Sequence, residues 1–256
     1  MKTVYICTDT VTGIFSAVYD AWNPARKGQE CGIALNEQVE ACLFCEYTEV
    51  EETAHKAEAV ARLIRCHLGS TAYQEISQAV LSYDGRKGDA ILQTMLEARK
   101  LPDSGRIMEH LSNPWVGQVF EMSRQVGCEA HHLKGFLRFR ELDNGILYGE
   151  IAPRSQVLSC LAPHFADRLP KENWMIRDLN YQMLAVHEAG KQWVLVWDQE
   201  MEEEKLSVLS GEEEKYARLW KDFCQAISIA SRENPKCQLH NLPLRFRPYM
   251  TEFERR

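Results

Sequence analysis

A short window of the chain concentrates side chains that could carry out acid–base chemistry. Between Glu129 and Lys134 it holds one carboxylate, two imidazoles and one ammonium group. Such groups transfer protons in hydrolytic reactions, and another carboxylate, Asp178, follows further along the chain. Glu129, His131 and Asp178 are therefore candidate catalytic residues, on the condition that they converge in one pocket. The alternative is that each imidazole makes ordinary hydrogen bonds within the fold.

Cations continue from this window into residues 133–141, a segment typical of a β-strand. Alternate residues of a strand point to the same face, so the strand would carry a row of cations with an aromatic ring among them. Cations neutralise phosphates and an aromatic ring can stack on a base, so this face is a candidate nucleic-acid contact. The alternative is a solvated face on which Arg138 pairs with Glu150 of the next strand. The side chains of the row are Lys134, Phe136, Arg138 and Arg140.

A second group of candidates lies on the helix expected after the next strand. His164 and Arg168 are four residues apart, which places them on one face of a helix. Arg154 and Arg138 would complete an anion pocket with them, or the helix face is an ordinary polar flank.

Near the C-terminus, cations alternate with an aromatic ring at Arg245, Phe246 and Arg247. This segment either reaches a phosphate backbone or docks as an arm on the body of the protein. The whole chain has a formal net charge of −7, so any contact with nucleic acid must be local.

The nine cysteines indicate no metal site. Cys42 and Cys45 form a Cys-x-x-Cys pair, but a structural zinc site needs a second matched pair. Reduced thiols, several of them buried, are the simpler interpretation. The chain also lacks a phosphate-binding loop and a dinucleotide fingerprint, so we expect neither a metal nor a cofactor.

Apolar residues recur at helical spacing through most of the N-terminal half. The opening predicts a strand, a helix and a second strand, with a loop at Asn23–Gly32. Four amphipathic helices follow, and the last begins at a cap formed by residues 112–114. The predicted elements are the strand Thr3–Thr8, the helix Thr12–Trp22, the strand Glu40–Thr48, the helices Ala54–Leu68, Ser70–Ser82 and Lys87–Arg99, and a helix from Pro114 onward.

A β-hairpin is predicted from Leu133–Glu141 and Ile146–Ile151. A three-residue loop with Gly145 in the left-handed conformation would place Arg138 opposite Glu150, whereas a two-residue loop would shift the register by one. The first register collects the apolar side chains on one face, so we expect it.

The rest of the chain predicts one helix, three short strands, a last helix and an irregular tail at Asn234–Arg256. Pro163 should kink or restart the helix Ser155–Leu169. Ser210 and Glu213 have the spacing of a capping box before the last helix. The strands are Trp174–Asp178, Met183–Glu188 and Trp193–Trp197.

This order of elements indicates an α/β or α+β fold with a mixed sheet, a β-hairpin and a helical insertion of about four helices. We expect a single domain over residues 1–256, with a helical subregion at 53–128 and a C-terminal helix plus docking tail at 210–256. No apolar run is long enough to cross a membrane and the first residues are too polar for a signal peptide, so a cytoplasmic protein without membrane contact is expected.

Several segments share their pattern with a known family. They are Glu129–Glu141, Ile146–Pro153, Leu161–Arg168, Trp174–Asp178, Gly190–Trp193, Asp9–Tyr19 and Leu242–Phe246. Together they resemble, over nearly the whole chain, a bacterial family whose members are labelled DNA metabolism or DNA repair proteins. His132 departs from the pattern, because Lys or Arg is expected there, and this weakens the cation row.

The resemblance implies a role in DNA repair or modification. Members of that family accompany a radical SAM protein that carries a DNA-binding type of helix-hairpin-helix, and some are fused to a uracil-DNA glycosylase-like domain. The resemblance therefore implies a radical SAM protein as the partner of this chain. The chain itself lacks the cysteine run of a radical SAM enzyme.

Three functions remain open at this point. The first is an accessory or DNA-contacting partner of the radical SAM protein. The second is a hydrolytic DNA-processing enzyme, a nuclease or a glycosylase, that acts through Glu129, His131 and Asp178. The third is a non-catalytic protein-interaction scaffold, in which the helical subregion or the acidic run Glu200–Glu214 binds the partner.

Overall fold

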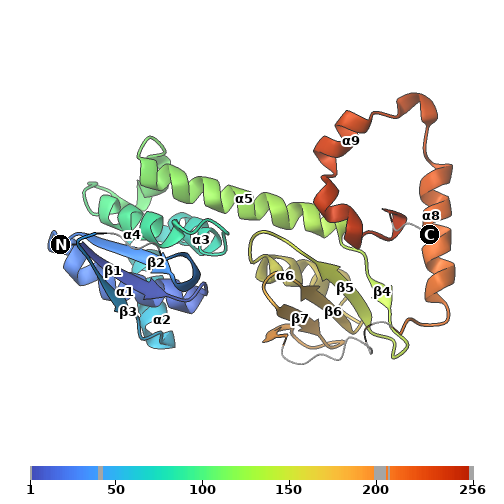
Figure 1. The fold of residues 1–256 in the computed structure, drawn as a ribbon, viewed down its shortest axis with the longest axis horizontal. Coiled ribbons are helices and arrows are strands. Elements are labelled where there is room, and N and C mark those ends of the chain that lie inside the picture. Colours follow the sequence, from blue (N-terminus) through green and yellow to red (C-terminus); the bar gives the residue numbers. More distant parts are fainter. Residues whose placement is uncertain (1, 40–42, 199–205, 207, 254–256) are drawn as a thin grey trace. The chain divides into compact units, whose positions relative to one another are not determined.

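The computed structural model describes residues 2–39, 43–198, 206 and 208–253 (Figure 1). Its contacts divide the chain into two compact units, Met1–Cys128 and Glu129–Arg256. The expected single domain over residues 1–256 stays a prediction, because compactness alone does not define a domain.

The first unit contains a three-stranded parallel sheet in the order β2-β1-β3. β1 (Lys2–Cys7) lies between β2 (Cys31–Leu35) and β3 (Cys45–Glu49). The predicted loop Asn23–Gly32 is wrong at both ends, because its first residues continue the preceding helix to Arg26 and its last residues begin β2. This strand is short and almost wholly buried, so it lacks the alternation that marks a half-buried strand. Cys42 of the Cys-x-x-Cys pair lies outside the described residues.

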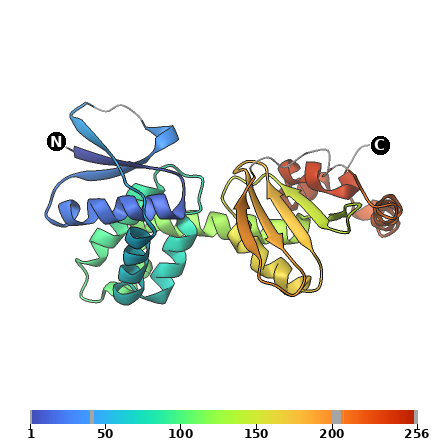
Figure 2. The same ribbon diagram turned by 90° about the horizontal axis from the view of Figure 1, so that it is seen from below.

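Helices pack on one side of this sheet (Figure 2). Two of them begin at threonine caps: Thr10 Oγ1 accepts a hydrogen bond from the N–H of Gly13 at 2.9 Å, and Thr53 caps the next helix in the same way. Four helices between β3 and the second sheet confirm the expected helical insertion. α1 (Val11–Arg26) lies between β1 and β2, and the four helices of the insertion are α2 (Ala54–His67), α3 (Gly69–Ala79), α4 (Lys87–Ala98) and α5 (Pro114–Phe136).

One ammonium group is buried in this unit. Lys87 is fully buried, and its Nζ donates to the carbonyl oxygen of Ser82 and lies 2.5 Å from Asp9 Oδ1. Burial lowers the pKa of Lys87, although the charge of Asp9 opposes the shift. Asp9 follows the central strand, so this ion pair ties the end of β1 to the start of α4.

The long helix α5 differs from the prediction at its C-terminal end. Asn113 caps it as expected, because its Oδ1 accepts a hydrogen bond from the first turn at 3.0 Å. The helix then continues through residues 133–136, which were predicted to be a strand. Its buried side chains recur at helical spacing through Ala130, Leu133 and Leu137, and burying this stripe favours the helix over a strand.

The second unit contains a five-stranded mixed sheet in the order β4-β5-β6-β7-β8. β5 and β6 are parallel, and the other neighbours are antiparallel. This sheet confirms the predicted fold class. α6 (Leu158–Arg168) connects β5 to β6 and continues through Pro163 as one helix. The strands are β4 (Arg140–Glu141), β5 (Leu147–Ile151), β6 (Trp174–Asp178), β7 (Met183–His187) and β8 (Val194–Trp197).

The hairpin formed by β4 and β5 has the predicted register but a much shorter first strand. Arg140 lies opposite Tyr148, as a three-residue loop requires, and Gly145 adopts a left-handed φ of 77°. Because β4 begins only at Arg140, Arg138 does not lie opposite Glu150. The predicted row of cations on one strand face is therefore wrong.

The last long helix is α8 (Glu213–Ala226). The predicted capping box is wrong: Ser210 Oγ donates to Glu141 Oε2, and Glu213 Oε2 accepts from the Glu141 N–H, both at 2.9 Å. These side chains join the start of α8 to β4 instead. The tail is not irregular throughout, because it contains α9 (Pro235–Asn241).

Short 3-10 turns complete the described chain. They are η1 (Asn36–Gln38), η2 (Ser104–Glu109), η3 (Ala230–Arg232), η4 (Leu244–Tyr249) and η5 (Thr251–Phe253). None of the helices in the described ranges combines the length and the hydropathy needed to cross a lipid bilayer.

Candidate functional site

Glu129 lies beneath the loop that follows β5. Its carboxylate accepts hydrogen bonds from the N–H groups of Arg154 at 3.0 Å and Ser155 at 2.9 Å. Its Oε1 also lies 3.1 Å from the guanidinium of Arg245 in the tail. Only 5% of Glu129 is exposed. This carboxylate therefore fastens a loop and the tail to α5, because its acceptor positions are directed at these three donors.

Asp178 ends β6 and is almost completely buried. Its Oδ1 accepts hydrogen bonds from the N–H groups of Asn180 at 3.0 Å and Tyr181 at 3.2 Å. Its Oδ2 has no hydrogen-bond partner among the described residues. Burial raises the pKa of Asp178 to about 7 against the effect of the two backbone bonds, and the charge of Glu129 adds to the rise. This carboxyl group therefore holds or releases a proton near neutral pH.

The structure brings two of the three catalytic candidates together. Glu129 and Asp178 lie close enough for one charge to affect the other. His131 is exposed on another face of α5, with its ring centre 6.3 Å from that of His132. In the described part of the chain, no three His, Cys, Asp or Glu side chains gather as a metal site would require. A joint acid–base step by the three candidates therefore has no geometric support.

Three of the proposed anion contacts converge at the end of α5 and along α6. Burial lowers the pKa of His164, the charges of Lys134 and Arg168 lower it further, and Asp167 opposes them. Lys134 and Arg168 are exposed, and neither forms an ion pair with another described residue. We call Lys134, His164 and Arg168 the α5–α6 cation cluster. It joins two helices and does not lie on a strand.

Phe136 belongs to a separate aromatic group that holds the tail. The Phe136 ring stacks on His132 with centres 5.7 Å apart, and it lies 5.2 Å from the ring of Phe246. The guanidinium of Arg245 lies 4.6 Å from the Phe246 ring centre, and that of Arg247 lies over another ring of the tail. The predicted docking arm therefore packs on α5 through Arg245 and Phe246.

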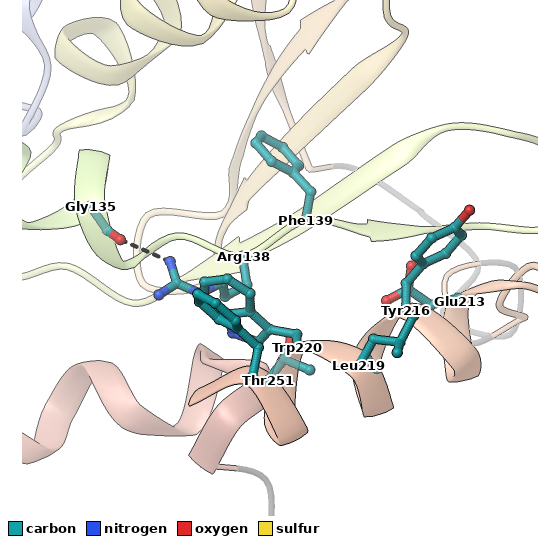
Figure 3. Close-up of a pocket in the computed structure, with 10 residues that line it drawn as sticks. Gly135, Arg138, Phe139, Glu213, Tyr216, Leu219, Trp220 and Thr251 are labelled. Atoms are coloured by element: carbon teal, nitrogen blue, oxygen red, sulfur yellow. Dashed lines mark hydrogen bonds between the residues drawn. The ribbon is translucent and has the colours of Figure 1, made fainter. Parts of the chain in front are cut away.

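Arg138 makes its contacts within the protein. Its guanidinium donates to Glu252 Oε1 at 2.8 Å and Oε2 at 3.2 Å. A further hydrogen bond runs to the carbonyl oxygen of Gly135 at 2.8 Å (Figure 3). It also lies 5.4 Å from the ring centre of Trp220, whose Nε1 donates to Glu252 Oε2 at 3.1 Å. Burial acts to raise the pKa of Glu252, but the hydrogen bonds from Arg138 and Trp220 hold it below its ordinary value. This triad fastens α8 and the tail to the end of α5.

A groove of about 790 Å³ opens beside the triad (Figure 3). One wall is an apolar stripe of α8 on which Tyr216, Leu219 and Phe223 are more than half exposed. The sequence predicts the helical spacing of this stripe, but it does not predict the exposure. Arg140 lies in a neighbouring groove of about 520 Å³. The larger groove is lined by Gly135, Arg138, Phe139, Glu213, Tyr216, Ala217, Leu219, Trp220, Phe223 and Thr251.

The sequence reasoning missed both partners of Arg138. Trp220 lies on the apolar stripe, which signals a helix but not what the helix contacts. Glu252 is 114 residues from Arg138 along the chain, and no local pattern reveals so distant a pair. The partner suggested from strand pairing, Glu150, accepts a hydrogen bond from the hydroxyl of Tyr148 at 2.7 Å instead.

Comparison with families of known proteins matches residues 86–252 to a family described as a domain of unknown function, DUF4130. The match begins just before α4 and includes the α5–α6 cation cluster, Glu129 and Asp178. No curated protein matches the chain.

Proposed function

Since the chain belongs to the DUF4130 family, whose function is unknown, we infer its function from its own side chains and propose an accessory protein of DNA metabolism. In this proposal the chain contacts DNA through the α5–α6 cation cluster. The resemblance described in the sequence analysis suggests the process and the partner, a radical SAM protein. The observation that carries the DNA contact is that Lys134 of α5 and Arg168 of α6 lie close enough to His164 for both charges to lower its pKa.

Phosphates are bound by cations that share a surface and keep N–H donors available. Lys134 and Arg168 meet both conditions, because they are exposed and form no ion pair with a described residue. Arg138 and Arg245 direct their guanidinium groups at Glu252 and Glu129. We therefore assign the phosphate contact to the cation cluster and give Arg138 and Arg245 the role of positioning the tail.

A contact made by two cations, Lys134 and Arg168, is weak and depends on salt, since the lowered pKa of His164 leaves that imidazole mostly neutral near pH 7. Neutralising about two phosphates of a single strand predicts a slope of roughly −1.4 in a plot of log K against log salt concentration. The net charge of −7 opposes DNA elsewhere on the surface. Binding is therefore expected at low ionic strength and at this surface.

The test is a fluorescence-anisotropy titration of a labelled single-stranded oligonucleotide at low salt. The variant Lys134→Ala with Arg168→Ala should weaken binding roughly tenfold or more, since each phosphate contact contributes about equally to the salt-dependent term. The matched control, Lys171→Ala with Lys191→Ala, removes the same charge from exposed sites of the same unit. Equal losses in the two variants, or no binding by the wild type, would refute the proposed contact.

The same titration separates the other functions. A hydrolytic enzyme should release cleaved products from the oligonucleotide, and these products should disappear in Asp178→Asn. A pure scaffold should bind no DNA while it co-purifies with the radical SAM protein. Co-purification of the full chain with that protein tests the proposed partner in its own right.

A further inference from the structure

A pocket of about 370 Å³ lies in the first unit, among the helices. The C-terminal ends of α1, α2 and α4 surround it together with η2. Met95 and Ala98 of its lining are fully buried, and Trp22, Leu63 and Leu101 are half-buried. Its interior is therefore apolar, as in most small-molecule pockets.

The rim of the pocket consists of two arginines and one histidine, side chains that carry or can take up a positive charge. Arg26 ends α1, His67 ends α2 and Arg99 follows α4, and all three side chains are exposed. No Asp or Glu is among the described residues that line the pocket. The three rim side chains also form no ion pair with any residue in the described ranges. The guanidinium of Arg99 lies 5.8 Å from the ring centre of Trp22, so it stands next to the apolar lining.

A structural role explains part of this arrangement. A cation at the C-terminus of a helix offsets the negative end of the helix dipole, and each rim residue ends a helix. Ser104 also donates its hydroxyl to the carbonyl oxygen of His67 at 2.6 Å, which satisfies one of the terminal carbonyls. Dipole compensation accounts for a cation at each helix end. It does not account for the apolar pocket that opens between Arg26, His67 and Arg99. The described lining of this pocket contains no acidic residue that could pair with them.

We propose that this pocket binds a small organic anion that has an apolar body and one carboxylate or phosphate group. The body would contact Trp22, Met95 and Ala98, and the anionic group would lie between Arg26 and Arg99. Ligand pockets hold about 300–1,000 Å³, so this pocket suits a fused ring or a short alkyl chain and not a larger cofactor. Because part of each cation's charge is used on a helix end, we expect modest affinity.

Isothermal titration calorimetry on the full chain tests this proposal with three probes. Naphthalene-2-carboxylate and octanoate carry the anionic group on an aromatic or an alkyl body, and naphthalene-2-carboxamide is the neutral control. At least one anion should bind with a dissociation constant near ~1 mM or tighter, as expected for about a dozen non-hydrogen atoms. The neutral amide should bind at least roughly tenfold more weakly than the matching acid, since the charged contact is then lost.

Two sets of variants locate the binding. Arg26→Gln with Arg99→Gln should weaken anion binding roughly tenfold or more and leave amide binding unchanged. The matched control, Lys27→Gln with Arg62→Gln, removes two exposed cations of the same unit outside the pocket and should bind as the wild type does. Leu101→Trp should fill the pocket and abolish binding of both acid and amide.

Each result decides the matter. Thermal unfolding of every variant first confirms that it is folded, and the rim substitutions are at exposed positions. Binding of neither anion, equal binding of acid and amide, or equal losses in the rim and control variants would overturn the proposal. Binding of one anion that the rim variant alone weakens would support it, and the tighter probe would identify the preferred body.

Discussion

Replacing Asp178 by Asn should remove a large part of the pH dependence of stability in the second unit. The carboxyl group is buried at the end of β6, and its Oδ2 has no hydrogen-bond partner among the described residues. Asn keeps a carbonyl oxygen for the N–H groups of Asn180 and Tyr181, and it cannot ionise. The substitution therefore removes the charge while it preserves the turn.

The sign and size follow from the pKa of the folded protein. That pKa lies at about 7, above the ordinary value of 3.8. The folded state thus keeps a proton that the unfolded state releases, and the stability linked to this group is lost as pH rises from 3.8 to about 7. Each pKa unit corresponds to ~1.4 kcal/mol, so the full loss is about 4 kcal/mol, of which about 2–3 kcal/mol falls between pH ~5 and pH ~8.

The assay is urea denaturation followed by tryptophan fluorescence at these two pH values. Wild type should lose about 2–3 kcal/mol more than Asp178→Asn between them. The control is Asp222→Asn, which changes an exposed carboxylate of α8 and should follow the wild type. If Asp178→Asn and the wild type show the same pH dependence, the carboxyl group titrates normally and the argument from burial fails.

Two further predictions concern buried or half-buried charges. Glu252→Gln should leave Arg138 without its counter-ion and lower the free energy of unfolding by about 1–3 kcal/mol. It should also loosen α8, which faster limited proteolysis of α8 would show, whereas the exposed Glu233→Gln should have no such effect. An unchanged cleavage rate in Glu252→Gln would mean that the triad does not hold the helix. Lys87→Met keeps the side-chain volume but removes the ammonium group that contacts Asp9 and the Ser82 carbonyl. Urea denaturation should therefore show a free energy of unfolding lowered by about 2 kcal/mol or more. An unchanged free energy of unfolding would show that the ion pair adds nothing over apolar packing.

Local patterns predicted the parts of the fold that they control. α2 and α4 begin and end within two residues of the predicted helices, because each carries an apolar stripe with a clear start. The turn at Gly145 and the hairpin register were also correct, since they depend on one left-handed residue and on the side-chain alternation. The mixed sheet and the insertion of four helices follow from the order of these elements.

Predictions failed where a contact distant in sequence decides the structure. Residues 133–136 have strand-like composition, yet the buried stripe of α5 keeps them helical. Ser210 and Glu213 have capping-box spacing, but both bind Glu141 of a strand far along the chain. The candidate site shows the same limit. The sequence named Glu129 and Asp178, yet only the fold shows that both are buried and close enough for one charge to affect the other, while His131 is exposed.

The Arg138–Glu252 pair also has a consequence for the chain as a polymer. Its two ends are 114 residues apart, so the pair closes most of the second unit into a loop. Closing a loop costs entropy that grows only slowly with its length, which means that a single half-buried contact can tie together so long a segment. The turn η5 therefore helps to hold α8 in place, since it carries Glu252. Removing η5 should therefore loosen α8, although α8 lies dozens of residues earlier in the sequence.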